Sequence, residues 1–190
     1  MKHAFFAYIA RMRYIRRWAL MRNSETENIQ EHSHMTAVLA HALALIENRC
    51  FGGHLDADRI AVQALYHDAT EILTGDMPTP IKYANPVIRE SYRAVEDTAT
   101  EHLLATLPED FRDAYAPLLA AEGENERIIK AADKLSAHIK CLEERKAGNL
   151  EFRKAEEQTL AALKSYRMPA LDYFMEHFLD AFLLTLDELD

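Results

Sequence analysis

The sequence predicts an all-α protein, a single compact helical bundle in which residues 1–190 form one domain. The chain contains only five glycines and six prolines among its 190 residues, so long stretches lack the residues that interrupt helices. The strong helix formers alanine, leucine, glutamate, lysine and arginine are abundant throughout. A chain of this length can also bury a full core without disulfides or structural metals. The pattern predicts about eight helices.

The N-terminal segment predicts a first helix over about residues 4–20. Its apolar side chains fall at the spacing that a packed amphipathic helix requires: Phe5, Tyr8, Ile9, Met12 and Ile15. Residues 1–24 contain no acidic residue and five arginines, a composition that also occurs in transit peptides. The regular apolar spacing favours docking onto the domain over a cleaved targeting segment.

Two helices are predicted between residues 24 and 73. Capping-box spacing at Ser24 and Glu27, or at Asn28 and Glu31, begins a second helix that runs to about residue 48. This helix is apolar around much of its circumference, which predicts a central position. After a turn at residues 50–54, an aspartate at position 56 or 58 caps a third helix, which extends to about residue 73.

Prolines and glycines divide the rest of the chain. Two prolines and a glycine within residues 74–80 exclude a helix there. Asn85-Pro86 begins a long helix, and Pro108 begins another. A further helix spans about residues 125–147 and is stopped by Gly148 in the C′ position. Two or three more helices complete the chain, with a break at Pro169.

Charge and cysteine usage exclude some classes of partner. The formal net charge of −9 disfavours a nucleic acid polymer, because proteins that bind one usually carry a basic face. No apolar run approaches the length that spans a bilayer. Cys50 and Cys141 are too far apart in sequence for zinc-ligand spacing and are interpreted as two reduced core thiols. These features favour a cytoplasmic protein.

Four residues far apart in the chain form the pattern His … His-Asp … Asp: His32, His67, Asp68 and Asp133. Two imidazoles and two carboxylates are enough donors for one divalent metal ion, which can activate water near neutral pH. Each residue falls within a predicted helix, and helical bundles build metal sites from facing helices. Neighbours on a helix differ by about 100°, so His67 and Asp68 are expected to approach one metal from different edges.

Any one of these residues alone is more simply an ordinary helical histidine or a solvated acid. Their contexts favour the metal, because a predominantly apolar segment precedes His67 and Asp133 lies in a helix with a buried face. Charged groups beside a buried surface need partners. Glu71 follows His67 by four residues and so shares its helix face. A carboxyl group in that place suits general acid/base work, and the alternative is an exposed glutamate at a helix end.

The stretches around these residues resemble the HD-domain phosphohydrolases, and more closely the bacterial HD-domain 5′-deoxynucleotidases. The matching stretches cover essentially the whole chain: Arg17-Trp18, Leu20–Asn23, Thr26–Ser33, Tyr66–Glu71, Leu73–Pro80 with Lys82-Tyr83, Lys130–Asp133, Lys140–Glu144 with Ala147–Asn149, and Leu171–Glu176. The Tyr-His-Asp and Thr-Gly-Asp-x-Pro-Thr-Pro stretches are specific together. A His-Asp dipeptide alone would indicate only the superfamily.

This resemblance implies an HD-domain helical bundle that hydrolyses deoxyribonucleoside 5′-monophosphates to deoxynucleoside and phosphate and discriminates against ribonucleotides. It also implies a cytoplasmic homodimer and one divalent metal ion, cobalt or manganese. By position, the metal ligands are His32, His67, Asp68 and Asp133. Of these, the resemblance places His32, Asp68 and Asp133 against the substrate as well.

The resemblance implies further roles by position. Glu71 is the catalytic acid, Arg17 holds the phosphate, and Trp18 excludes the ribose 2′-hydroxyl. The sugar and base are contacted by a run of four residues: Asp76, Met77, Pro78 and Thr79. Without the resemblance, Arg17 would be interpreted as a solvated helix arginine and Trp18 as a core aromatic residue.

Two other functions stay open. The first is another HD-type enzyme, either a triphosphohydrolase acting on deoxynucleoside triphosphates or a cyclic-nucleotide phosphodiesterase. A triphosphate needs several basic groups, and the evident cluster near the motif lies between Arg11 and Arg22. The second is a non-catalytic helical binding module whose metal is structural or absent.

Overall fold

The computed structural model describes residues 2–82 and 85–189, so Tyr83 of one family-like stretch lies outside the described residues. Within these ranges the α-helices are α1 (Phe5–Ile9), α2 (Ile29–Cys50), α3 (Ala57–Tyr66), α4 (Glu71–Thr74), α5 (Thr79–Lys82), α6 (Pro86–Ala105), α7 (Glu109–Leu119), α8 (Gly123–Lys146), α9 (Arg153–Ser165) and α10 (Pro169–His177). The 3₁₀ helices are η1 (Ala10–Tyr14), η2 (Leu150–Phe152), η3 (Leu179–Leu183) and η4 (Leu186–Glu188). The same ranges contain no β-strand beyond an isolated bridge between Arg16 and Asn28. The predicted all-α fold class is confirmed.

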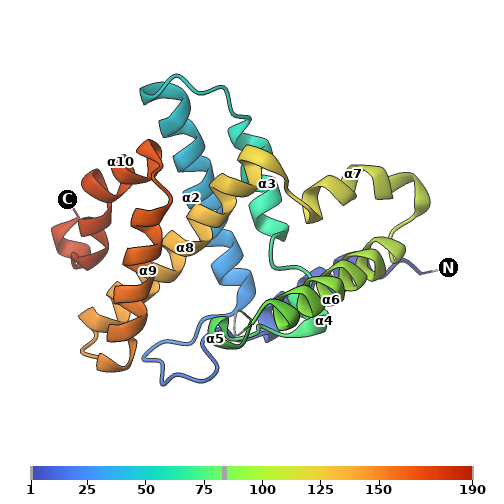
Figure 1. Cartoon of the computed structure of the whole chain (residues 1–190), viewed down its shortest axis with the longest axis horizontal. Helices are drawn as coiled ribbons and strands as arrows, with labels where there is room; N and C mark the ends of the chain where they lie inside the picture. The colour runs from blue at the N-terminus through green and yellow to red at the C-terminus, as the bar shows by residue number, and fades with distance from the viewer. Residues whose placement is uncertain (1, 83–84, 190) are drawn as a thin grey trace.

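Helices α2 and α8 cross in the middle of the molecule, with α3 beside α2 (Figure 1). Helices α9 and α10 lie on one side of this pair and α6 and α7 on the other (Figure 1). The main core is formed by side chains of the central helices, which include Leu39, Leu43, Ile60, Leu135 and Leu171. The central position predicted for the second helix is therefore correct. No helix in the described ranges is both long and apolar enough to cross a bilayer.

The helix ends follow the local sequence signals closely. Asn28 caps α2, because its Oδ1 accepts hydrogen bonds from the amides of Gln30 and Glu31 at 3.0 Å each. The Asn28 amide donates to Glu31 Oε2 at 3.3 Å, which completes a capping box. Of the two caps considered for α3, Asp56 is the one that accepts a hydrogen bond, from the Arg59 amide at 3.0 Å.

The later helices also begin and end where their sequence predicts. Asn85 caps α6 by accepting from the Ile88 amide at 2.9 Å, and Pro86 is the first helical residue. Gly148 has φ +81° after α8, a conformation that glycine adopts without strain. The amides of Gly148 and Asn149 donate to carbonyls of the last helical turn at 2.9 Å each, as in a Schellman motif. Pro169 begins α10.

The N-terminal segment differs from the single helix predicted to about residue 20. Helix α1 ends at Ile9, η1 ends at Tyr14, and the backbone then becomes extended at Ile15. The Arg17 amide donates to the Glu27 carbonyl, and the Ile15 carbonyl accepts from the Ile29 amide, both at 3.0 Å. The segment before α2 thus provides the backbone partners that a continued helix would have provided. The docking prediction is confirmed, because Phe5 and Met12 are buried.

The third helix ends earlier than predicted, at Tyr66, and α4 begins only at Glu71. The Ala64 carbonyl accepts a hydrogen bond from His67 Nδ1 at 2.7 Å. A continued α-helix would instead have bonded that carbonyl to the Asp68 amide. The His67 side chain thus takes the place of the next backbone amide as the hydrogen-bond donor to the Ala64 carbonyl. The prediction that His67 and Asp68 lie within a helix was wrong. The non-helical stretch predicted for 74–80 ends at Pro78, since α5 begins at Thr79.

Candidate metal centre

The structure brings together the four residues that the sequence pattern singled out. One donor atom from each of His32, His67 and Asp68 lies within 4.8 Å of the other two. Asp133 Oδ1 is 3.0 Å from His32 Nε2, and Asp68 Oδ2 is 3.7 Å from the same nitrogen. His32 comes from the first turns of α2, Asp133 from α8, and the His-Asp pair from the turn after α3. Residues separated by about a hundred positions therefore converge on one point.

A hydrogen bond at Nδ1 orients the ring of each histidine, so that Nε2 faces the cluster. His67 Nδ1 must donate to the Ala64 carbonyl, because a carbonyl oxygen only accepts. In the neutral ring this leaves His67 Nε2 with a lone pair. That nitrogen is buried and lies 3.2 Å from Asp68 Oδ2, with no hydrogen bond of regular geometry among the described residues. His32 Nδ1 lies 3.2 Å from Ser136 Oγ, which leaves His32 Nε2 facing Asp133. An unpaired imidazole nitrogen beside two carboxylates fits a divalent metal ion.

Both carboxylates of the cluster are held in the ionised form. Burial by itself would raise the pKa of Asp68, but His67, then His32 and Arg17, outweigh burial and lower the pKa to about 2. For Asp133, the hydrogen bond and charge of His32 outweigh burial, so its pKa is also lowered. Burial lowers the pKa of His67, and Asp68 more than offsets this effect and raises it. Two anionic oxygens are thus available at neutral pH, as a metal site requires.

Arg17 and Trp18 lie beside this cluster, in the loop that joins η1 to α2. Arg17 Nη1 is 3.5 Å from Asp68 Oδ2, and burial of Arg17 is outweighed by Asp68 and Asp133, which raise its pKa. Trp18 has φ +56°, which is uncommon for a residue other than glycine. Its ring contacts Phe152 edge-on, with centroids 5.2 Å apart. Arg17 is therefore not a solvated helix residue, and its guanidinium faces the carboxylates.

Glu71 begins α4 and is only 7% exposed. Burial, followed by the charges of Asp68 and Asp76, raises the pKa of Glu71 to about 9. Its Oε2 is buried without a hydrogen-bond partner among the described residues. At neutral pH the side chain is thus an uncharged acid, able to donate a proton to a group that enters the site. The alternative considered from the sequence, an exposed glutamate at a helix end, is excluded by this burial.

The remaining residues predicted to contact the substrate lie between α4 and the first residue of α5. Asp76, Met77 and Pro78 are partly buried. Burial raises the pKa of Asp76, while the charge of Arg17 lowers it and that of Asp68 raises it further. The backbone of Thr79 begins α5, and its side chain lies outside the described residues.

Sequence reasoning missed two side chains that organise the site. Glu27 was considered only for a capping box, yet its Oε2 accepts hydrogen bonds from Arg17 Nε and Trp18 Nε1 at 3.0 Å each. No local pattern predicts this contact, because the loop has no regular period. Ser136 supports His32 and lies three residues after Asp133 on α8, so it shares a face with that ligand. The helical spacing could have identified Ser136.

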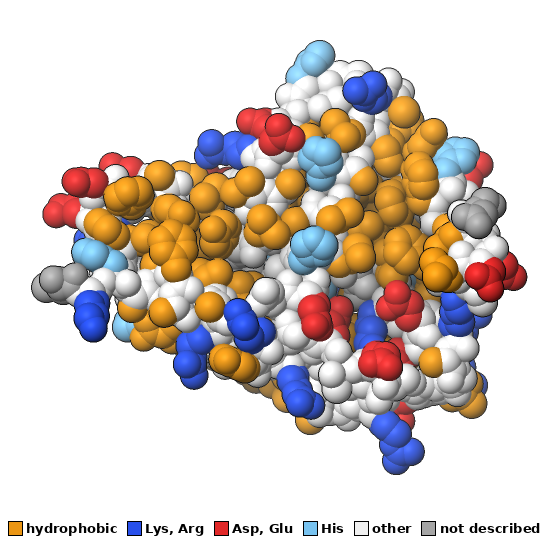
Figure 2. Space-filling view, turned by 180° about the vertical axis from the view of Figure 1, so that it is seen from behind, with side chains coloured by type: hydrophobic (Ala, Val, Ile, Leu, Met, Phe, Trp, Pro, Cys, Tyr) orange, Lys and Arg blue, Asp and Glu red, His pale blue; other side chains and the backbone are white. Residues whose placement is uncertain are grey.

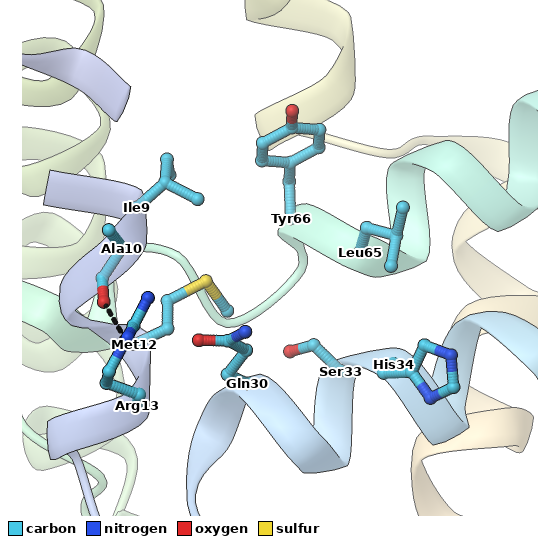
Figure 3. Close-up of a pocket in the computed structure, with 9 residues that line it drawn as sticks. All are labelled: Ile9, Ala10, Met12, Arg13, Gln30, Ser33, His34, Leu65 and Tyr66. Carbon is cyan, nitrogen blue, oxygen red and sulfur yellow. Dashed lines mark hydrogen bonds between the residues drawn. The ribbon is translucent and has the colours of Figure 1, made fainter. Parts of the chain in front are cut away.

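A cavity of about 310 Å³ lies beside the cluster and is separate from it. Figure 3 shows that its walls come from α1, η1, the first turns of α2 and the end of α3. Ser33 and Tyr66 line this cavity, although they are the sequence neighbours of His32 and His67. None of the predicted ligands lines it. We therefore assign the candidate site to the polar cluster and not to this hollow.

An all-α fold with this His-His-Asp-Asp cluster defines the class of HD-domain phosphohydrolases. A crystal structure of an HD-domain phosphohydrolase from Listeria innocua is similar to the chain, with a TM-score of 0.84 at 25% identity, over 97% of this chain and 90% of that one. An HD phosphohydrolase of cyanophage S-2L, bound to dA and one catalytic Zn²⁺ ion, has the same fold, with a TM-score of 0.66 at 18% identity, over 92% and 96% of the two chains.

The sequence comparisons are more specific than the fold. The family model described as 5′-deoxynucleotidase YfbR-like matches residues 4–182. The chain is 50% identical to the 5′-deoxynucleotidase YfbR of Escherichia coli, over 97% of this chain and 94% of that protein. The chain belongs to the YfbR-like 5′-deoxynucleotidase family, as its resemblance to HD-domain 5′-deoxynucleotidases had led us to expect.

Proposed function

We propose that this protein is a metal-dependent 5′-deoxynucleotidase. Its reaction is the hydrolysis of deoxyribonucleoside 5′-monophosphates to deoxynucleoside and phosphate, with discrimination against ribonucleotides, and the whole chain acts as one HD domain. The observation that carries the proposal is the convergence of donor atoms from His32, His67 and Asp68 within 4.8 Å of one another. Family membership and the adjacent Arg17 support it.

We assign His32, His67, Asp68 and Asp133 as the residues that hold the metal ion. When bound, a divalent ion supplies positive charge for the phosphoryl oxygens and lowers the pKa of water. The chain's own residues do the rest. His67 Nε2 is kept free for coordination by the hydrogen bond that its Nδ1 donates to Ala64. Three of the ligands, His32, Asp68 and Asp133, also face the substrate phosphate.

Arg17 is the residue proposed to hold the phosphate. A guanidinium is suited to this work because its planar fork matches two phosphate oxygens and it stays charged at all physiological pH values. Among the nearby arginines, Arg13 donates to the carbonyl of Ala10 and Arg11 lies over the Tyr14 ring. These two arginines are thus engaged within their own segment, whereas Arg17 faces the cluster.

Glu71 is the proposed acid. Phosphomonoester hydrolysis needs a proton for the leaving oxygen, and burial raises the pKa of the Glu71 carboxyl above its ordinary value, which favours the protonated form. Trp18 is proposed to exclude the ribose 2′-hydroxyl, and Asp76, Met77, Pro78 and Thr79 to contact the sugar and base. Trp18 directly follows Arg17, so the two side chains bracket the sugar and its phosphate.

The metal identity, assembly and location form part of the same proposal. We favour cobalt or manganese as the ion, a cytoplasmic location and a homodimer, with neither a nucleic acid polymer nor a membrane as partner. Hydrophobic side chains are spread over the face of the molecule in Figure 2. Large exposed apolar residues occur on several helices and include Phe6, Val38 and Leu65. Apolar surface of this kind suits a second copy of the chain, and light scattering after gel filtration tests the dimer.

A phosphate-release assay, with chromatography of the nucleotide products alongside, tests the proposed reaction. The chromatography is needed because neither the opening of cyclic AMP to AMP nor the removal of triphosphate from dATP releases inorganic phosphate. The protein is stripped with a chelator and offered dAMP, AMP, dATP or cyclic AMP, each with and without added cobalt or manganese. Phosphate release from dAMP that depends on added metal and exceeds release from AMP supports the proposal. Preferential hydrolysis of dATP or cyclic AMP would assign the protein to the other HD-type enzymes. Absence of turnover on all four would favour a binding module.

A further inference from the structure

The loop of residues 15–28 carries both Arg17 and Trp18, although it has no regular secondary structure to hold them in place. Trp18 adopts φ +56°, which lies in the left-handed region. A bulky residue stays in this region only when its surroundings fix it there. The position of the two side chains is therefore determined by side-chain contacts, one from within the loop and others from α8 and the residues that follow it.

Glu27 provides the first of these contacts, with the side chains of Arg17 and Trp18 themselves. A single carboxylate oxygen, Glu27 Oε2, accepts hydrogen bonds from Arg17 Nε and from Trp18 Nε1, each at 3.0 Å. The Glu27 carbonyl also accepts from the Arg17 amide at 3.0 Å. With Nε engaged by Glu27, the outer edge of the guanidinium faces Asp68, 3.5 Å away at Nη1. One carboxylate thus fixes both side chains relative to each other and to the cluster.

A buried ion pair on α8 provides the second contact, at the other end of the loop. Glu144 is 1% exposed and Lys140 is 7% exposed, and the two form a salt bridge. Glu144 accepts from the Ser24 amide at 2.9 and 3.1 Å, and Lys140 Nζ donates to the Glu25 carbonyl at 2.6 Å. Asn149 Nδ2 donates to Glu144 Oε2 and to a loop carbonyl at 2.7 Å each. We call Lys140, Glu144 and Asn149 the α8 brace.

The α8 brace also reaches Trp18 through one aromatic ring. Lys140 Nζ lies 5.9 Å above the centre of the Phe152 ring, and that ring packs against Trp18. Replacing a buried ion pair by apolar residues is often neutral or stabilising, so such a pair is weak evidence for a contribution to stability alone. Here almost every hydrogen-bonding group of the pair is directed at the loop, which points to a role in fixing its conformation.

We propose that Glu27, with the loop anchored by the α8 brace, is a positioning residue that sets substrate selectivity by holding Arg17 and Trp18 in one relative arrangement. This inference rests on the proposed function, because it takes Arg17 as the phosphate contact and Trp18 as the sugar contact. Glu27 touches neither the substrate nor the reacting atoms. It acts by fixing the position of Arg17, which binds the phosphate, relative to that of Trp18, which excludes the 2′-hydroxyl.

The first test is spectroscopic and independent of activity. Trp18 is the only tryptophan of the chain, so its fluorescence reports the loop directly. In Glu27→Ala we expect emission at longer wavelength and acrylamide quenching at least twofold stronger than in the wild type. Glu27→Gln keeps an acceptor oxygen and should restore most of the wild-type signal. The matched control is Glu25→Ala, because Glu25 is exposed, lies on the same loop and carries the same charge.

The second test is kinetic and uses the metal-loaded enzyme. Glu27→Ala should lower kcat/KM for dAMP at least tenfold, chiefly through KM, and narrow the dAMP/AMP ratio at least threefold at unchanged metal content. Trp18→Phe keeps a ring but removes the hydrogen-bond donor to Glu27. Glu27→Ala should therefore change the dAMP/AMP ratio less in a Trp18→Phe background than it does in the wild-type background. Lys140→Met removes the cation of the α8 brace. It should also shift Trp18 emission to longer wavelength and narrow the dAMP/AMP ratio, as Glu27→Ala does.

The outcomes separate the inference from the function on which it rests. Unchanged Trp18 fluorescence in Glu27→Ala would overturn the positioning role even in a fully active enzyme. Loss of metal from Glu27→Ala would overturn it too, since Glu27 Oε1 lies 4.0 Å from His32 Nδ1 and would then act through that ligand. If the wild type hydrolyses no nucleotide while the fluorescence responds as expected, the proposed function fails and the positioning of the loop stands.

Discussion

Glu71 lowers the stability of the folded protein at neutral pH, and this effect can be measured. The pKa of Glu71 rises from its ordinary 4.5 to about 9, first because of burial and then because of Asp68 and Asp76. Between these values the unfolded chain releases a proton that the folded chain keeps. The free energy of unfolding therefore falls as the pH rises. At pH 7 the loss covers about 2.5 pH units at about 1.4 kcal/mol each, or roughly 3 kcal/mol.

We predict that Glu71→Gln stabilises the metal-free protein at pH 7, because the amide cannot ionise in either state. The gain should approach the same figure of roughly 3 kcal/mol. For a chain of this size it corresponds to a rise in Tm of about 6–12 °C. The gain should become small as the pH approaches 4.5 and vanish below it, where the carboxyl group is protonated in both states. Added metal should also reduce it, since a cation beside Asp68 lowers the pKa of Glu71.

The assay is thermal unfolding of chelator-treated protein across a pH series, with the wild type and Glu90→Gln alongside. Glu90 is exposed on α6, so its amide variant controls for the loss of one negative charge. Turnover of dAMP by Glu71→Gln should be lost while its metal content is kept, because the acid acts in the transition state. A Tm equal to or below that of the wild type at pH 7, or a gain that persists at pH 4.5, would refute the raised pKa. Loss of metal would instead place Glu71 among the ligands.

Three further predictions follow from the site and the core. Asp68→Ala should lose metal and activity while its helical circular dichroism stays near that of the wild type, since one oxygen donor is removed from a mononuclear site; full turnover by this variant would contradict the ligand assignment. Trp18→Ala should raise kcat/KM for AMP relative to dAMP, because an apolar pocket alone rejects an added hydroxyl by only about a hundredfold; an unchanged ratio would assign selectivity to residues 76–79. The interpretation of both cysteines as core thiols was wrong for Cys50, which is exposed, and correct for Cys141, which is buried and whose pKa burial raises to about 12. A thiol reagent should therefore label one cysteine of the native protein and two after denaturation, and rapid native labelling of both would contradict the packing around α8.

Features determined by local chemistry could be predicted from the sequence. The capping box of α2, the Asn85-Pro86 start of α6 and the Gly148 stop of α8 each depend on a few neighbouring residues. The chemical class of the site could also be predicted, because metal ligands are distinctive residue types even when they are scattered along a chain. In the structure these scattered residues lie close together, as the pattern predicted.

Features determined by contacts between distant segments could not be predicted. The apolar spacing of residues 5–15 predicts a longer helix, but the loop backbone pairs with the residues just before α2 instead. The end of α3 depends on one hydrogen bond from a histidine side chain to a backbone carbonyl, which no helical pattern reveals. The contact of Glu27 with Arg17 and Trp18 joins positions ten and nine residues apart in a segment without a period.

The residues of the site are held in two different ways: the proposed metal ligands mostly by core helices, and the proposed substrate contacts by a loop. His32 and Asp133 project from α2 and α8, the helices that form the main core, and Ser136 of α8 orients the histidine. A metal site needs this rigidity, because its ligands must stay close to one geometry. Arg17 and Trp18 come instead from a loop that the main core does not include. That loop is fixed by polar contacts with Glu27 and the α8 brace. Under the roles proposed for Arg17, Trp18 and the four metal-binding residues, substitutions in these polar contacts would therefore alter which nucleotide is accepted while the metal site stays in place, so selectivity could change within this fold without loss of the chemistry.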